Sequence, residues 1–437
     1  MNDVVVLGSG MAAIGASYRL RQEAIPHVAY DKKWHAGGHT SSSRDEHGFV
    51  FDEGPYISFT KNERIKGLLA EAVRGDFLTF SAKVNNLWRG HWIKHPAQCN
   101  LHGLPTDLVV KIIEDMYASR GVPVKPANYE EWLVASYGRT FAEHFPMQYG
   151  KKYHTVEARL MSLDWLGKRL YQPSMTEVLT GALAESTPDV HYISDFRYPA
   201  NGGFQAYLKP FHQKMKLQLG HRLVRIDIRR NRLTFANGTV VPYSRLISSL
   251  PLPALIATIP DAPPEVRAAA DKLACSICLV VNVGLSRPDI SESHWTYFYD
   301  DDFCFSRISF PHMFSPNNAP PGMGSIQCEI YFSDKYKPVT GTPTEWRDRA
   351  IADLCRAGLI RADDRIVSSS VVRVNYANVI FDLDRAGALK VVRGYLDELG
   401  IESCGRYGEW GYQWTDESFI SGERAAQRVL DRSLVRV

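Results

Sequence analysis

The glycine-rich stretch from Val4 to Ala13, VVVLGSGMAA, is the part of the sequence with the clearest chemical meaning. Gly8 and Gly10 allow a tight turn and a close backbone approach to a pyrophosphate, whose charge then faces the free amides of a helix N-terminus. A carboxylate about 20 residues further on, Asp31, can accept hydrogen bonds from a ribose. An ordinary strand-to-helix turn is the alternative, but strand, turn, helix, strand and acid in this order favour a bound dinucleotide.

Two segments downstream indicate which dinucleotide this is. Gly37 to Thr40 and Phe49 to Pro55 resemble the second and third FAD contacts of the flavoprotein group that contains amine oxidases, protoporphyrinogen oxidases and UDP-galactopyranose mutases. FAD is therefore the expected cofactor. The resemblance implies that the residues binding it are Gly8, Gly10, Met11, Ala12, Ala13, Asp31, Lys32, Gly38, His39, Thr40, Gly54, Pro55, Tyr56, Val224, Arg406, Asp416, Ser418 and Phe419.

Over most of its length the sequence resembles UDP-galactopyranose mutase, and the eukaryotic branch more than the common bacterial one. The stretches that carry this resemblance are Pro96 to Leu101, Trp165 to Arg169, Tyr198 to Gly203, Trp295 to Phe298, Phe305 to Arg307 and Gly405 to Tyr412. In that family the reduced flavin N5 attacks the anomeric carbon of the sugar, UDP leaves, and the opened sugar closes again as a furanose. The resemblance therefore implies isomerisation of a nucleotide-activated sugar without net redox change.

Two arginines match the residues that hold the substrate diphosphate in the mutases, Arg169 and Arg307. A planar, always charged guanidinium suits phosphate oxygens, although a surface or inter-lobe salt bridge is the alternative role for either side chain. The resemblance implies that the catalytic residues are Arg169, Arg307, Tyr376, Tyr412 and Tyr56, and that Gln98, Asn100, Arg169, Tyr297, Arg307, Tyr376 and Tyr412 bind substrate.

The sequence departs from the mutases at four positions. Tyr56 stands where they carry a histidine beside the flavin, and Ala97 replaces the phenylalanine that stacks on uracil. His154 takes the place of a tryptophan of the helical lobe, and Phe314 that of a tyrosine facing the diphosphate. The residues expected to hold a diphosphate are thus retained better than those that read the base.

Three functions follow from these observations. The first is a FAD-dependent sugar mutase for polysaccharide or glycoconjugate biosynthesis, active in the reduced form with NAD(P)H as reductant. The second is a FAD-dependent oxidoreductase of the amine oxidase or protoporphyrinogen oxidase type, which the loss of the flavin-side histidine favours. The third is a flavin-binding protein with little catalysis, which fold resemblance alone does not exclude.

The elements that must position these residues follow from hydrophobic periodicity. Strands and helices alternate over about the first 80 residues, and apolar residues three and four apart predict helices at 107–120 and 175–185. Strands are expected at 223–228, in a hairpin at 232–241 turned by Asn237-Gly238, and in a second sheet between 276 and 372 that includes 295–299 and 326–332. A last helix is expected near Ser418.

We therefore predict an α/β fold with a discontinuous Rossmann-like FAD-binding domain, a helical lobe and a second, antiparallel sheet lobe. The FAD-binding domain is expected to comprise residues 1–85, 191–255 and 396–437. The helical substrate lobe is expected at 86–190 and the antiparallel sheet lobe at 256–395.

The composition narrows the class of protein. A chain of 437 residues with 45% hydrophobic and 23% charged residues is typical of a globular protein of two or three lobes, and a net charge of +3 does not indicate binding to nucleic acid or to an anionic membrane. No apolar run reaches the ~20 residues of a membrane span, and no signal peptide is expected. A small-molecule substrate is the expected partner, and a homo-oligomer stays an open alternative.

Cysteine and histidine usage argues against disulfides and metal. Seven irregularly spaced cysteines favour a reducing compartment, so we predict a cytoplasmic protein. The pair Cys275 and Cys278 lies in an apolar run and is expected to be part of a buried strand. His91 and His95 flank residues typical of a strand and a turn, so no metal site is expected.

Overall fold

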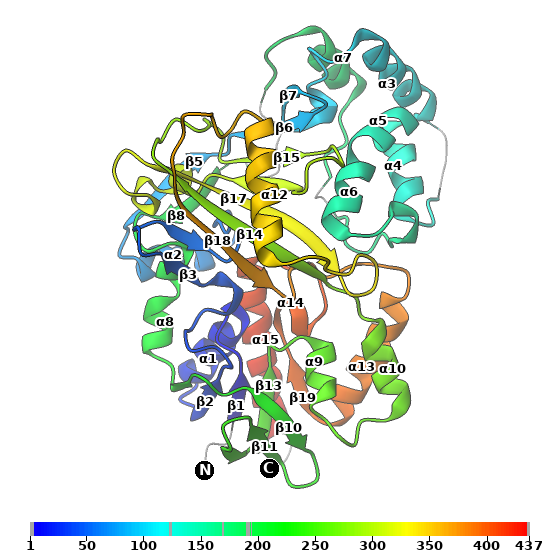
Figure 1. The fold of residues 1–437 in the computed structure, drawn as a ribbon. Helices are drawn as coiled ribbons and strands as arrows, with labels where there is room; N and C mark the ends of the chain where they lie inside the picture. The colour runs from blue at the N-terminus through cyan, green and yellow to red at the C-terminus, as the bar shows by residue number, and fades with distance from the viewer. Residues whose placement is uncertain (1–3, 122–124, 168–169, 189–192, 194, 435–437) are drawn as a thin grey trace.

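The computed structural model describes residues 4–121, 125–167, 170–188, 193 and 195–434 of the chain. Figure 1 shows a lower lobe that contains both the first and the last described elements, a large sheet across the middle, and a helical lobe at the upper right. The α/β class, with a Rossmann-like sheet, a second sheet and a helical lobe, is confirmed.

A five-stranded parallel sheet forms the lower lobe, in the order β19-β13-β1-β2-β9. All four residues of β1 are buried, as expected for a parallel strand covered on both faces. The strands are β1 (Val4–Leu7), β2 (His27–Tyr30), β9 (Leu217–Gln218), β13 (Arg245–Ser248) and β19 (Ile401–Ser403). Beside it lies a three-stranded sheet of β10 (Leu223–Asp227), β11 (Arg232–Phe235) and β12 (Val240–Pro242), which contains the predicted hairpin.

Two helices pack directly on each other in this lobe, α1 (Met11–Gln22) and α15 (Thr415–Leu434). A Cβ atom at Gly422 would lie 1.8 Å from the Ala12 carbonyl oxygen, and one at Gly15 would lie 2.0 Å from that of Phe419. Any larger residue at either glycine would push the helices apart. The last helix begins at Thr415, slightly before the predicted start near Ser418.

The second sheet has seven strands in the order β18-β14-β17-β16-β15-β6-β7. It is antiparallel except between β15 and β6, which run parallel, so the prediction of an antiparallel sheet holds for five of its six strand pairs. Every residue of β14 and β17 is buried. The strands are β6 (Val84–Trp88), β7 (His91–Lys94), β14 (Ser276–Leu285), β15 (Trp295–Phe298), β16 (Arg307–Ser309), β17 (Gly324–Ser333) and β18 (Ile366–Val374).

The helical lobe contains the helices predicted at 107–120 and 175–185, which the structure has as α3 and α7. Its members are α3 (Thr106–Ser119), α4 (Tyr129–Tyr137), α5 (Arg139–His144), α6 (Pro146–His154) and α7 (Met175–Leu183). Ser174 and Glu177 form a reciprocal capping box at the start of α7. The domain boundaries stay a prediction. Strand β6, which crosses the predicted boundary at residue 86, and β7 belong to the large sheet.

A buried lysine fixes the helical lobe to the large sheet. Lys152 of α6 donates hydrogen bonds to the carbonyl oxygens of Phe298 (3.1 Å), the last residue of β15, and of Asp300 (2.6 Å), which follows the strand. Burial lowers the pKa of this ammonium group to about 8. These hydrogen bonds therefore hold helix α6 of the helical lobe in place against the seven-stranded sheet.

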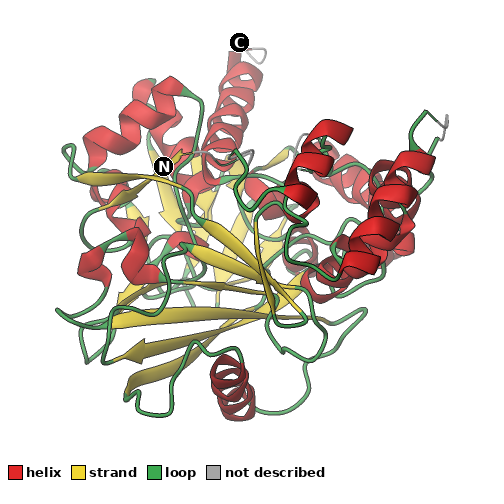
Figure 2. Ribbon diagram, turned by 90° about the horizontal axis from the view of Figure 1, so that it is seen from above, coloured by secondary structure: helices red, strands yellow, loops and turns green. Residues whose placement is uncertain are grey.

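The remaining elements connect and cover the sheets. Helix α12 lies across the outer face of the seven-stranded sheet, and the view from above shows it alone on that side (Figures 1 and 2). These elements are α2 (Glu63–Ala72), β3 (Ser42–Arg44), β4 (Val50–Asp52), β5 (Phe77–Ser81), β8 (Asp195–Pro199), α8 (Lys209–Gln213), α9 (Leu252–Ala257), α10 (Pro264–Lys272), α11 (Pro311–Phe314), α12 (Pro343–Arg356), α13 (Arg385–Glu398) and α14 (Gly405–Gly408).

Three further properties concern membranes, disulfides and metals. None of the helices within the described ranges has both the length and the apolar character to cross a membrane. The seven cysteines, all of which are described, are free thiols, and Cys278 is buried in β14. Across the described part of the chain, no three His, Cys, Asp or Glu side chains are grouped so that they could hold a metal ion.

Candidate functional site

A groove of about 820 Å³ runs along the carboxyl end of the parallel sheet. Its walls come from the turn between β1 and α1, the loop after β2, the start of β10 and helix α14. Of the residues predicted to bind FAD, those that line it are Gly8, Gly10, Met11, Ala12, Asp31, Lys32, Gly38, His39, Thr40, Tyr56, Arg406 and Ser418.

Glycines shape the floor of this groove. Gly8 has a φ of +114°, and a Cβ atom there would lie 2.1 Å from the Ser249 hydroxyl oxygen. A Cβ atom at Gly38 would lie 3.1 Å from the Cα atom of Gly10, so the two loops touch through backbone alone. No side chain caps the N-terminus of α1, and its first turn holds no acidic residue. The amides of this turn can therefore face a bound anion.

The acid at the end of β2 is held in a fixed position. The Asp31 carboxylate accepts hydrogen bonds from the Ser9 hydroxyl (2.6 Å) and from the backbone N–H of Lys33 (2.8 Å). One bond comes from the glycine turn and the other from the loop after the strand. The carboxylate thus ties together the two segments that line this end of the groove.

A second carboxylate, Glu53, lines the groove where it adjoins a second cavity. Burial alone would raise its pKa, but contacts from His39, the Lys33 ammonium group and the Ser41 hydroxyl (2.8 Å) hold the pKa at about 2. Glu53 is therefore ionised at neutral pH and balances the charge of Lys33.

Six residues predicted to bind FAD do not line the groove. Ala13 is fully buried inside α1, and Leu223 lines the groove in place of its neighbour Val224. Asp416 instead accepts a hydrogen bond from Thr60. The other three are Gly54 and Pro55, which line a second cavity, and Phe419, whose ring packs on those of Tyr18 and Phe211.

The second cavity, of about 320 Å³, lies between the helical lobe and the seven-stranded sheet. Aromatic rings form most of its wall, and they come from α4, α5 and α6 on one side and from β15 and β17 on the other. The cavity adjoins the groove, because both spaces are lined by Glu53, Tyr56, Val374, Arg406, Tyr407, Gln413, Trp414 and Thr415.

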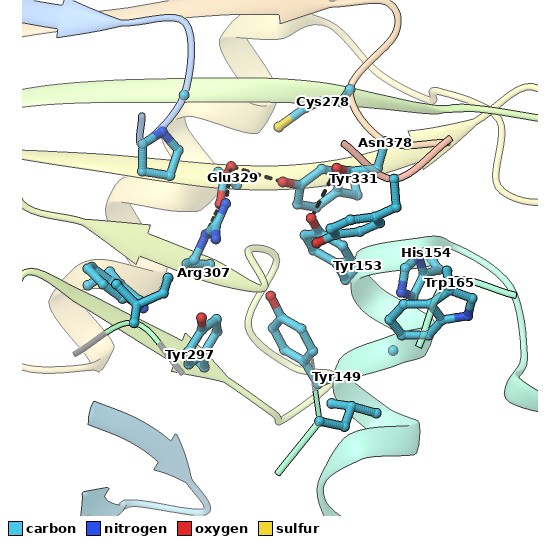
Figure 3. A pocket seen from close by; sticks show the side chains of 18 of the residues that line it. Tyr149, Tyr153, His154, Trp165, Cys278, Tyr297, Arg307, Glu329, Tyr331 and Asn378 are labelled. Carbon is cyan, nitrogen blue, oxygen red and sulfur yellow. Dashed lines mark hydrogen bonds and ion pairs between the residues drawn. The ribbon is translucent and has the colours of Figure 1, made fainter. Parts of the chain in front are cut away.

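An ion pair on the sheet side of the cavity joins Arg307 and Glu329 (Figure 3). The guanidinium group uses Nε and Nη2 on the two carboxylate oxygens, with Nη2 2.9 Å from Oε1, and the Tyr331 hydroxyl donates to the same Oε1 at 2.9 Å. Burial opposes the charge on Arg307, but the neighbouring Glu329 carboxylate raises the pKa of the Arg307 guanidinium well above its ordinary value. The arginine predicted to hold a diphosphate is thus already paired with a carboxylate.

A second polar cluster lies where the cavity meets the groove. The Asn378 side-chain oxygen accepts hydrogen bonds from the Tyr153 hydroxyl (3.0 Å) and from Nη2 of Arg406 (2.7 Å). The Arg406 guanidinium carbon lies 4.8 Å from the ring centre of Tyr412, and its buried Nε has no hydrogen-bond partner within the described part of the chain. No carboxylate of the described residues pairs with Arg406, so a positive charge lies at this junction.

The residues predicted to be catalytic or to bind substrate fall into three groups. Those that line the cavity are Gln98, Tyr297, Arg307 and Tyr412, together with Tyr56, which was predicted to be catalytic. Tyr376 lines the groove instead, and Asn100 is buried with its amide donating to the Pro96 carbonyl (2.9 Å), so neither lines the cavity. Arg169 lies outside the described residues. The binding roles of all these residues stay predictions.

Sequence reasoning missed several residues of the cavity, above all Glu329, Asn378 and Tyr153. Glu329 had a recognisable signal, because it is a charged residue within the otherwise apolar strand pattern at 326–332. A carboxylate inside a buried strand requires a partner, and Arg307 lies directly opposite it in the register of β16 and β17. The other two residues lie far apart in the sequence and carried no such signal.

Comparison with known proteins agrees with this architecture. Residues 6–72 match the family model of an NAD(P)-binding Rossmann-like domain. A structure of reduced UDP-galactopyranose mutase superimposes with a TM-score of 0.92 at 26% sequence identity, over 99% of this chain and 96% of that one. The chain is similar to UDP-galactopyranose mutase along nearly its whole length. This confirms the resemblance that the sequence indicated.

Two oxidases share the fold at lower similarity. A protein of Exiguobacterium sp. 255-15, provisionally assigned as a protoporphyrinogen oxidase, has a TM-score of 0.75 at 13% identity over 98% of both chains. Cyclohexylamine oxidase from Brevibacterium oxydans has a TM-score of 0.67 at 13% identity, over 98% of this chain and 99% of that one. These three similar structures are thus those of a mutase and of two proteins named as oxidases, and the two at 13% identity support the fold alone.

Proposed function

We propose that this protein is a FAD-dependent enzyme that isomerises a nucleotide-activated sugar between its pyranose and furanose forms. The observation that carries the proposal is that the groove adjoins the cavity, in a chain that superimposes on UDP-galactopyranose mutase almost from end to end. The furanose product would serve polysaccharide or glycoconjugate biosynthesis.

The residues of the groove fit FAD. Gly10 and Gly38 leave room for a pyrophosphate at the N-terminus of α1, and Asp31 is positioned for a ribose. The unpartnered Nε of Arg406, buried where the groove meets the cavity, suits a ring carbonyl or ring nitrogen. A dinucleotide lying along the groove would therefore bring its reactive ring to the mouth of the cavity.

When bound and reduced, a flavin supplies a nucleophilic ring nitrogen, and the protein supplies orientation and electrostatics. The charge of Arg406, without a carboxylate partner among the described residues, would stabilise negative charge on the ring. The aromatic wall would exclude water from the sugar. The phenol groups of Tyr297 and Tyr412 would donate hydrogen bonds to the leaving nucleotide.

Product analysis tests the proposal. The FAD-loaded enzyme, reduced with dithionite or with NAD(P)H, is incubated anaerobically with UDP-galactose, UDP-glucose and the corresponding GDP-sugars, and products are analysed by chromatography and NMR. We expect a furanose product with at least one nucleotide sugar, and none with the oxidised enzyme. If no furanose product forms with any of these nucleotide sugars, the proposal is contradicted.

A second candidate, net oxidation of a small substrate, is favoured by one observation. Glu329 neutralises the arginine that was predicted to hold a diphosphate, so the sheet side of the cavity suits a substrate without one. Anaerobic mixing of the oxidised enzyme with amines and alcohols separates the candidates. Bleaching of the flavin absorbance by a substrate alone would support oxidation, because a mutase needs prior reduction by another donor.

A further inference from the structure

His154 is a buried residue on the cavity wall whose ring has no hydrogen-bond partner among the described residues. It ends helix α6, only 4% of its surface is exposed, and its Nδ1 is buried without a partner. Within the described part of the chain, its ring makes no hydrogen bond through Nε2 either. An unmet hydrogen bond at a buried polar atom is costly, so such atoms usually have a partner that the protein alone does not show.

Aromatic packing, rather than hydrogen bonding, fixes the position of this ring. Its centre lies 4.9 Å from that of Tyr153, edge to face, and 5.1 Å from that of Trp165. Figure 3 shows His154 and Trp165 side by side on the helical side of the cavity. The imidazole is thus held rigidly while its nitrogen atoms stay available, which suits recognition of a ligand.

The charge state of the ring limits what it can recognise. Burial, together with the nearby Arg406 charge, lowers the pKa of His154 to about 3. The ring is therefore neutral at physiological pH and offers one donor and one acceptor. The same Arg406 charge disfavours a cationic ligand at this place. A hydroxyl group, which can donate and accept, is the complementary partner.

The neighbouring polar groups are already satisfied by one another. Asn378 accepts from both Tyr153 and Arg406, and on the opposite side Arg307 pairs with Glu329. His154 is therefore not needed to complete either cluster. Its position carries a tryptophan in the mutases that the sequence resembles, so a hydrogen bond made here would be a property of this chain.

We propose that His154 determines substrate specificity by hydrogen bonding to a hydroxyl group of the sugar. This inference rests on the proposed function, because it takes the substrate to be a sugar. On this proposal, His154 alone recognises one hydroxyl group of the sugar, whichever residues bind the nucleotide.

The first test uses stability and needs no substrate. If the ring has no partner inside the protein, H154F removes an unsatisfied buried group and should raise the Tm of the FAD-loaded enzyme by about 1–3 °C. The matched control is His294, which is 3% exposed, lines neither space and accepts a hydrogen bond from the Lys83 amide at Nδ1 (3.0 Å). H294F should lower the Tm. An equal loss of Tm in both variants would overturn the inference.

The second test uses deoxygenated substrates. The reduced enzyme is assayed with UDP-galactose and its 2-, 3- and 6-deoxy analogues. We expect one analogue to raise KM about ten-fold in the wild type, and H154F to raise KM for UDP-galactose about as much, with kcat changed less than three-fold. H154F should no longer discriminate that analogue, whereas H154Q, which keeps a donor and an acceptor, should retain most of the discrimination.

The two arms separate the failure of this inference from that of the proposed function. If wild-type enzyme turns over neither UDP-galactose nor its analogues, the proposed function fails for this sugar, and the Tm comparison decides the hydrogen-bonding state of His154. If it turns over all of them and H154F retains the same preferences, the inference is wrong while the proposed function stands.

Discussion

The groove and the cavity meet at Tyr56 and Arg406, but they are built in different ways. The groove is formed largely by backbone and glycine from short, local motifs such as the turn at Gly8 and Gly10. The cavity is formed by side chains from helices and strands far apart in the sequence. A cofactor common to many enzymes can be held by backbone, whereas a particular substrate must be read by side chains.

The two spaces also differ in electrostatics. In the groove, Lys33 and Glu53 balance each other beside backbone amides that can face a phosphate. In the cavity, Arg307 and Glu329 cancel on the sheet side, while Arg406 carries the remaining charge at the junction. The comparison indicates that the uncompensated charge lies beside the cofactor groove, and that the substrate cavity offers mainly neutral hydrogen-bonding groups.

The largest effect is expected from an added methyl group in the groove. G8A places a Cβ atom 2.1 Å from the Ser249 hydroxyl at a backbone angle that alanine rarely adopts. FAD affinity should fall about a thousand-fold, measured by calorimetry on protein reconstituted with FAD. The control is G238A, which also has positive φ but has open space around it in the β11–β12 turn, and should retain its FAD. If G8A binds FAD with wild-type affinity, the close backbone approach at Gly8 is not what holds the cofactor.

A loss of stability without loss of cofactor is expected in the cavity. R307M leaves the buried Glu329 carboxylate without its cation and should lower the free energy of unfolding by about 3 kcal/mol, measured by urea denaturation. The double variant R307M/E329M removes both charges and should recover most of that loss. Both proteins should stay yellow. Loss of FAD from R307M would show that the two spaces are not independent.

The ionisation of Glu53 gives the groove a pH signature. Its pKa falls from 4.5 to about 2 on folding, so the stabilisation is fully present above about pH 4.5 and is lost as the pH falls toward 2. The difference in unfolding free energy between wild type and E53Q should therefore be about 3 kcal/mol at pH 7 and about 2 kcal/mol at pH 3.5. E292Q, at an exposed position, serves as the control and should show no such trend.

The smallest effect concerns ligand affinity in the cavity. E329Q frees Arg307 from its carboxylate, and a freed guanidinium should bind a diphosphate more strongly. UDP binding, followed by the change in flavin absorbance, should tighten about ten-fold, which corresponds to about 1.4 kcal/mol. Unchanged UDP affinity would mean that the diphosphate is held elsewhere, and would separate Arg307 from the nucleotide.

Sequence reasoning predicted the groove better than the cavity, for a physical reason. The turn at Gly8, the acid Asp31 and the Asn237-Gly238 hairpin are local patterns whose spacing fixes their geometry. Pairing of Arg307 with Glu329 depends on strand register between β16 and β17, which local patterns do not determine. For the same reason, the pairing of β6 with β15 was not anticipated.

Two residues predicted to bind substrate do not line the cavity, for a similar reason. Tyr376 was matched to the substrate site by resemblance, but it lines the groove. Asn100 was placed in the same site, but its side chain is used to fix the Pro96 turn and lies beneath the surface. Tertiary packing decides where each of these side chains lies, and their binding roles stay predictions.

The close packing of α1 against α15 has a consequence for biosynthesis. When the ribosome has released the N-terminal glycine turn, the strands β13 and β19 and the helix that rests on Gly15 have not yet been translated. The strand β1 can pair with β2 and then with β13 during synthesis, but the face of α1 that packs on α15 must stay uncovered until the final helix emerges. Coenzyme capture would then be a late, post-translational event, and the unfinished chain a natural client for chaperones.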